Sequence, residues 1–93
     1  MAIVARTVIP EGTPEQAADW AARTSGVLRA APGFIAQADG PAPEGGWQII
    51  SIWDSNADLE RYLDSAVRPY LPPGQPVAPT LVSPAHTVFL ADR

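Results

Sequence analysis

The sequence predicts an α+β fold of the ferredoxin-like type, in which a four-stranded antiparallel sheet carries two helices on one face. The first observation is the spacing of apolar residues, which changes along the chain between the strand and the helix pattern. It gives the order β-α-β-β-α-β. The second is that Gly and Pro separate these segments at short intervals. Right-handed crossovers between the segments then place both helices on one face of the sheet. The third is length, since 93 residues fit a single domain spanning residues 1–93.

The first half of the predicted unit is a strand followed by a long helix. Residues 2–9 alternate loosely and are rich in β-branched side chains, which is typical of a strand. Thr13 is placed to cap the helix, Pro14 occupies its first position, and Gln16 closes a capping box. The helix is expected to run to about Ala30, where a Pro-Gly pair follows and ends it.

Two further strands follow and are joined by a hairpin. Residues 34–39 and 47–53 have strand-like patterns, and the Gly- and Pro-rich residues 40–46 form the loop between them. The segment 47–53 carries apolar groups on both faces, which predicts a central strand covered on both sides.

The last part of the chain is predicted to contain a second helix and an edge strand. Ser55 is placed to cap the helix, and Pro69 is expected to end it. Six prolines between residues 69 and 84 predict a stiff, ordered loop. The final strand is expected over residues 81–90, with Pro84 restricting it to the edge of the sheet.

Composition excludes several classes of protein. A net charge of −4, with six arginines and no lysine, argues against a nucleic-acid partner. The absence of cysteine excludes disulfides and thiolate sites, and one histidine without clustered acids predicts no metal site. No apolar run approaches the ~20 residues that span a bilayer, so no membrane association is expected. Residues 1–10 lack the pattern of a signal peptide, and we therefore expect a cytoplasmic protein.

Apolar residues on both faces of the sheet predict a partner. With both helices on one face, the other face would be left open, and a second copy of the same sheet would cover it. We therefore expect a homodimer that associates through the sheets. The neighbouring residues that place apolar groups on both faces of the sheet are Ile3 and Val4, Ile49 and Ile50, and Val88 and Phe89.

Several motifs resemble one known family. The segments are Pro32-Gly33-Phe34-Ile35, Gly46-Trp47-Gln48-Ile49-Ile50-Ser51-Ile52-Trp53-Asp54-Ser55, Leu59-Glu60-Arg61-Tyr62-Leu63 and Pro69. They resemble the antibiotic biosynthesis monooxygenase-like proteins of the dimeric α+β barrel superfamily. The haem-degrading branch of that superfamily is disfavoured, because its three functional positions are occupied here by Ala5, Tyr62 and Pro72.

The resemblance implies an enzyme of natural-product biosynthesis. It would be a monooxygenase that needs neither a metal nor an organic cofactor and that acts on an aromatic, polyketide-like small molecule. Two alternatives remain open, because this fold hosts several functions. One is a polyketide cyclase or isomerase, and the other is a non-catalytic accessory dimer that binds a small ligand.

Three residues are candidates for catalysis. His86 is the natural general base, since its ordinary pKa lies near neutrality. Arg6, in an otherwise apolar strand, either orients a substrate oxyanion or pairs with a carboxylate such as Asp54 or Asp92. The phenol of Tyr62 is expected to point into a space between helix and sheet and to bond a substrate oxygen.

Four residues are candidates for substrate binding. Trp47, Ser51 and Trp53 share one parity on the third strand, where the two indoles would form an aromatic wall for a flat substrate. Tyr70 opens the proline-rich segment and would close over the substrate. The alternative for each aromatic residue is packing in the core or at the dimer interface, and for Tyr70 it is anchoring of the loop.

Overall fold

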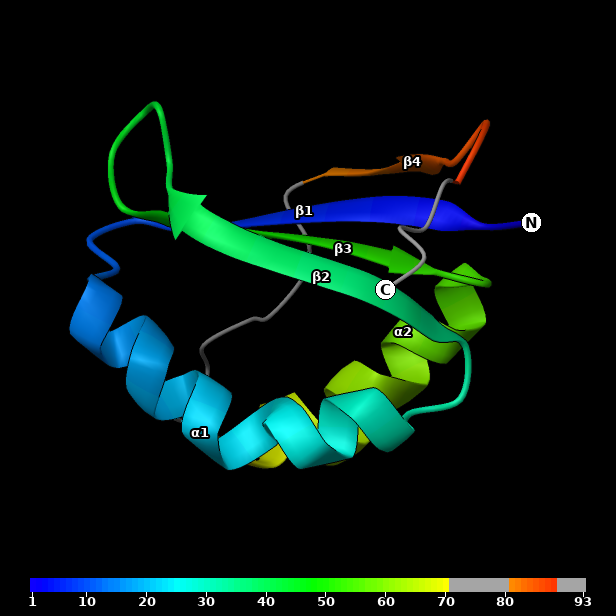
Figure 1. Ribbon diagram of the computed structural model, residues 1–93, viewed down its shortest axis with the longest axis horizontal. Helices are drawn as coiled ribbons and strands as arrows, with labels where there is room; N and C mark the ends of the chain where they lie inside the picture. Colours follow the sequence, from blue (N-terminus) through cyan, green and yellow to red (C-terminus); the bar gives the residue numbers. More distant parts are fainter. Residues whose placement is uncertain (71–80, 89–93) are drawn as a thin grey trace, which may run out of the picture.

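The predicted ferredoxin-like architecture is confirmed. A computed structural model describes residues 1–70 and 81–88. Their four strands form one antiparallel sheet, and both helices lie on the same side of it (Figure 1). Strand β1 (Ile3–Ile9) and helix α1 (Pro14–Ala30) come first, and strands β2 (Phe34–Pro41) and β3 (Trp47–Trp53) follow. Helix α2 (Asn56–Tyr62) and strand β4 (Leu81–Pro84) complete the order.

The sheet has the order β2-β3-β1-β4, which places β3 and β1 at its centre. Pairing of Ala5 with Ser51, and of Gln37 with Ser51 on the other side, sets the register across three strands. Since paired residues point to the same face, this register gathers the odd-numbered residues of β1 and β3 under the helices. The even-numbered residues point to the opposite face, which the helices do not cover.

Helix α1 begins as predicted. The backbone N–H of Gln16 donates to Thr13 Oγ1 (3.2 Å), and the backbone N–H of Thr13 donates to Gln16 Oε1 (3.1 Å). This reciprocal pair satisfies two N–H groups that the first helical turn leaves without partners. Pro14 occupies the first turn, where its missing N–H costs nothing.

The second helical region differs from the prediction. Ser55 caps α2 as expected, by accepting a hydrogen bond from the Asp58 N–H (3.2 Å). Pro69, however, does not end one continuous helix. A π-helical turn, η1 (Leu63–Val67), follows α2 directly, and Pro69 lies inside the next short 3₁₀ segment, η2 (Arg68–Tyr70). The Ser65 hydroxyl donates to the carbonyl of Arg61 (3.0 Å) and supports the widened turn.

Strand β4 is shorter than predicted. It pairs with β1 at the edge of the sheet, as expected, but it ends at Pro84 rather than extending to residue 90. Proline has no N–H to continue the ladder, and one further backbone bond, from the N–H of Ala85 to the carbonyl of Ala2 (2.8 Å), closes the pairing. His86 therefore lies in a bend beyond the strand. Residues 89 and 90 lie outside the described part of the chain.

The core lies between the helices and the covered face of the sheet. Trp53 is its largest fully buried side chain, and it packs with the buried aliphatic residues of α1, α2 and η1. The opposite face of the sheet is apolar and partly exposed, as Ile50 (39%) and Leu81 (60%) show. No helix among the described residues is long and apolar enough to cross a membrane.

Candidate functional site

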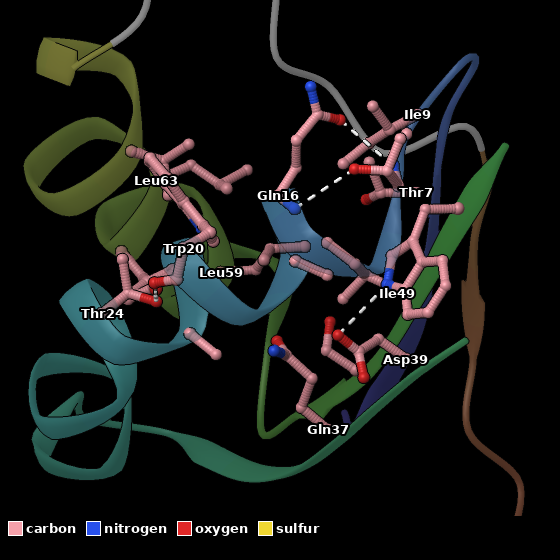
Figure 2. Close-up of a pocket in the computed structure, with 18 of the residues that line it drawn as sticks. Thr7, Ile9, Gln16, Trp20, Thr24, Gln37, Asp39, Ile49, Leu59 and Leu63 are labelled. Atoms are coloured by element: carbon pink, nitrogen blue, oxygen red, sulfur yellow. Dashed lines mark hydrogen bonds between the residues drawn. The ribbon is translucent and has the colours of Figure 1, made fainter. Parts of the chain in front are cut away.

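A cavity of about 420 Å³ lies between the two helices and the covered face of the sheet. Figure 2 shows Trp20 and Thr24 on α1, Leu59 on α2 and Leu63 on η1 facing Ile49 of the sheet across it. This volume falls within the range of pockets that hold drug-sized molecules. A fold of this size with a solid core would have no comparable space for a ligand.

Three tryptophans line the cavity. Trp47 and Trp53 belong to β3 and share one face with Ser51, as the sequence pattern predicts, and the structure shows that this is the face the helices cover. Trp20 is half-buried and also lines the cavity, from α1. The walls are therefore aromatic on both the sheet side and the helix side.

Trp53 forms the inner wall of the cavity. Its ring meets Phe34 edge to face (centroids 5.3 Å apart) and lies tilted against Tyr62 (5.4 Å). Its indole Nε1 is buried and has no hydrogen-bond partner among the described residues. The position of Trp53 thus rests on ring packing, and its buried N–H lowers stability because the group has lost its contact with water.

Tyr62 also lines the cavity, from the end of α2. Burial raises the pKa of its phenol, and the nearby Thr24 side chain partly offsets this effect. The Thr24 hydroxyl in turn donates to the carbonyl of Trp20 (2.9 Å). A phenol with the ordinary pKa of about 10 is protonated at neutral pH, and the upward shift keeps Tyr62 so, which presents a neutral hydroxyl group to the cavity.

The mouth of the cavity is more polar than its interior. Asp39 and Gln37 of β2 are both exposed and both line it. The indole Nε1 of Trp47 donates to Asp39 Oδ2 (3.2 Å), as the dashed line beside Asp39 in Figure 2 marks. This bond fixes Trp47 against the carboxylate at the open end. Gly12 lies against the same indole side chain, and a Cβ atom there would meet Trp47 Cβ at 2.8 Å.

Arg6 does not line the cavity. Its side chain lies on the uncovered face of the sheet, where it donates to Glu44 (2.6 Å to Oε1) and to Gln48 Oε1 (3.0 Å). The ion pair predicted from the sequence is therefore present with Glu44 rather than Asp54 as the partner, and Asp92 lies outside the described residues. The guanidinium holds the pKa of the Glu44 carboxyl below its ordinary value. An oxyanion-binding role of Arg6 in the cavity has no geometric support.

His86 is exposed and does not line the cavity. Its Nδ1 lies 3.0 Å from the hydroxyl of the neighbouring Thr87. The predicted general base is thus separated from Tyr62, Trp47, Ser51 and Trp53, which the structure brings together around one space. The side chain of Tyr70 falls outside the described part of the structure, and its role as a cover stays a prediction.

Several lining residues were not singled out from the sequence. The main ones are Asp39 and Gln37 at the mouth and Thr24 behind Tyr62. The alternation of β2 contains the signal for the first two, because residues 37 and 39 share the parity of a strand face that the helices cover. No comparable signal identifies Thr24, since a threonine within a helix has many ordinary roles.

Metal ligands do not cluster in this site. Among residues 1–70 and 81–88, no group of three His, Asp or Glu side chains is placed to hold a metal ion. The titratable residues that line the cavity in this part of the chain are Asp39 and Tyr62.

Comparisons with known proteins give one structural likeness of interest. No protein-family model matches the chain, and no curated protein matches it. The chain is similar to a solved structure of SnoaB, a cofactor-independent oxygenase from Streptomyces nogalater, in a mutant form. The identity is 24%, the match covers 70% of this chain and 67% of that chain, and the TM-score is 0.48. A likeness of this degree assigns no activity to the chain.

Proposed function

We propose that the cavity binds a flat, mostly apolar aromatic molecule. The observation that carries this proposal is the cavity of about 420 Å³ whose walls include Trp20, Trp47 and Trp53. Aromatic walls favour offset stacking on a planar ring system, and the apolar lining favours its transfer from water. Along β3, Trp53 lies four positions beyond Ile49, the partner of Asp39. This spacing corresponds to roughly 13 Å between the inner wall and the mouth, enough for several fused rings.

The reaction that we propose is monooxygenation without a metal or organic cofactor, as the motifs around Trp53 imply by resemblance. A substrate with an acidified methylene group, such as an anthrone, loses a proton to give an electron-rich carbanion. The carbanion transfers electrons to dioxygen and forms a carbon–oxygen bond. In the balanced reaction, a CH₂ group and O₂ give a carbonyl group and one molecule of water.

Tyr62 is the residue of the predicted catalytic set that the geometry supports. Its protonated phenol faces the cavity, where it can donate a hydrogen bond to the substrate oxygen on which negative charge develops. Such a donor, held in place in a dry site, stabilises the carbanion more than the neutral substrate. The geometry gives no such support to His86 as the proton acceptor, because His86 lies away from the cavity.

Non-catalytic ligand binding is the second candidate, and one observation favours it. The described residues that line this aromatic, ligand-sized space include no histidine, and their one carboxylate, Asp39, lies at the mouth, where it accepts a hydrogen bond from Trp47. A binding protein needs only that space, whereas the oxygenase needs a proton acceptor in addition. A cyclase or isomerase needs the same proton transfer and is distinguished by its product.

The binding proposal is tested by a pair of neighbouring substitutions on α1. Ala17 lines the cavity, whereas Ala18, the next residue of the same helix, does not. Ala17→Phe fills part of the space and is expected to weaken binding of an anthrone at least tenfold, as measured by quenching of tryptophan fluorescence. Ala18→Phe, the matched control, is expected to bind as the unchanged protein does. Equal binding by both variants would place the ligand elsewhere.

The reaction is tested with an oxygen electrode under metal chelation. Oxygenation predicts uptake of one O₂ for each anthrone converted to anthraquinone, and a rate that falls at least tenfold in Tyr62→Phe. A rearranged product formed without oxygen uptake would identify a cyclase or isomerase. Unchanged anthrone after saturable binding would identify the binding protein. Loss of turnover in His86→Ala with unchanged binding would retain His86 as the base.

We also propose that two copies associate through the uncovered faces of their sheets. The support is a pair of exposed apolar side chains, Ile50 and Leu81, which flank the ion-paired Arg6 on a face that no described element covers. Burying such a surface against a second copy removes it from water, and the two-fold arrangement pairs each face with itself. The cavity lies on the opposite side of the sheet, so dimerisation would leave its helix-side walls within one copy.

A further inference from the structure

We propose that Asp39 makes the cavity selective for ligands that carry a positively charged amine at the mouth and selective against ligands that carry a carboxylate there. This inference rests on the proposed binding of an aromatic molecule. It adds the charge of the ligand, which neither the aromatic walls nor the apolar volume determines.

The charge of the described lining comes from one residue. Asp39 is its only charged side chain. The chain has no lysine, and five of its six arginines lie in the described part of the structure, where none of them lines the cavity. His86 does not line it either. A ligand carboxylate would therefore meet a negative charge with no lining cation to offset it.

The geometry of Asp39 suits a cationic group. A carboxylate has about four acceptor positions, and the indole N–H of Trp47 occupies one of them through Oδ2 (3.2 Å). The remaining positions can accept from the three N–H donors of an ammonium group. The Trp47 ring beside the carboxylate adds a face on which a cation is attracted to the π electrons.

The neighbouring polar groups do not cancel this preference. Gln37 lies two residues along the same face of β2, and Gln16 lies on α1, so both add neutral donors and acceptors to the lining. The inner end contains Tyr62, which is protonated at neutral pH. A single carboxylate at an exposed mouth changes affinity by about fivefold for a cation and by a similar factor in the opposite direction for an anion. The two factors together predict that the amine binds at least about tenfold more tightly than the carboxylate.

The experiment uses three ligands with one ring system. Anthracene carrying an aminomethyl, a hydroxymethyl or a carboxylate group is cationic, neutral or anionic at neutral pH. Binding is followed by quenching of the three tryptophans, all of which line the cavity, and is repeated by calorimetry. The expected order of affinity is amine, then alcohol, then carboxylate, with at least about tenfold between the first and the last at low salt. Added salt should reduce the difference in affinity between the amine and the carboxylate.

Two variants assign the effect to Asp39. Asp39→Asn keeps an acceptor for Trp47 but removes the charge, and it is expected to reduce the ratio of amine to carboxylate affinity at least fivefold. Asp19→Asn is the matched control, because it makes the same change of net charge on the exposed side of α1, where Asp19 pairs with Arg23 (3.3 Å). The control is expected to leave the ratio unchanged.

The results separate the failure of this inference from the failure of the proposed function. If the alcohol binds but the ratio is the same in the unchanged protein and in Asp39→Asn, selection by Asp39 is wrong and aromatic binding stands. If the Asp19→Asn control lowers the ratio equally, the effect belongs to net charge and the inference fails. If none of the three ligands binds, both proposals are overturned.

Discussion

Replacing Trp53 with phenylalanine tests whether its buried N–H truly lacks a partner. Phenylalanine keeps a ring between Phe34 and Tyr62, whose centroids lie 5.3 and 5.4 Å from that of Trp53, but removes Nε1. The smaller ring buries roughly 50 Å² less apolar surface. At ~25 cal/mol per Å², this lowers the free energy of unfolding by ~1.2 kcal/mol. Removing an unpaired buried donor restores ~1–3 kcal/mol. The two effects are opposite and similar in size.

We therefore expect Trp53→Phe to change the free energy of unfolding by less than ~1 kcal/mol in either direction. Trp53→Ala, which deletes the ring contacts, should cost ~3–5 kcal/mol. Both free energies of unfolding are measured by urea denaturation, monitored by far-ultraviolet circular dichroism. The comparison requires that the variants have equal m-values, the slopes of the free energy against urea concentration.

Trp47→Phe provides the control, because it removes an indole N–H that does have a partner, Asp39. A loss of more than ~2 kcal/mol in Trp53→Phe would refute the reasoning, because it would mean that Nε1 is satisfied in solution.

Three further predictions concern titration, association and a turn. Burial raises the pKa of Tyr62, so above about pH 10 the unfolded chain loses this proton before the folded chain does, and stability falls as pH rises; Tyr62→Phe should flatten this part of a pH series of urea midpoints. Ile50→Glu places a charge on the uncovered sheet face, and sedimentation should change from twice 9.8 kDa to a single chain; a monomeric unchanged protein would contradict the dimer. Gly33 has φ +82°, and a Cβ atom there would overlap the Asp58 side chain, so Gly33→Ala should cost ~1–3 kcal/mol in urea unfolding unless the turn can rearrange.

Local signals in the sequence predicted most of the fold. Thr13 and Gln16 form the expected capping box, and Ser55 caps the second helix, because these bonds join residues three apart in the chain. Strand parity predicted that Trp47 and Trp53 share one face, since alternation in β3 is also a local property, but it did not predict which face the helices cover.

The errors concern interactions between distant segments. Arg6 pairs with Glu44 because the β2–β3 hairpin brings that loop over the uncovered face, and no residue near Arg6 in the sequence indicates this. His86 was placed on a strand because its neighbours are apolar, yet β4 ends at Pro84, where pairing with β1 stops. The π-helical turn after Tyr62 has no pattern of its own, since its apolar residues also fit an α-helix.

The capping box at the start of α1 has a consequence for redesign of the cavity. Thr13 and Gln16 both line the cavity, yet Thr13 Oγ1 and Gln16 Oε1 already accept backbone N–H groups of the first turn. A substitution that removed either oxygen would leave a backbone N–H at the start of the helix without its partner, so these two positions resist replacement. Substitutions that broaden specificity are better placed at Gln37 or Ile49, where the sheet supports the backbone independently of the side chain. The start of α1 thus limits which parts of this wall can diverge without loss of the fold.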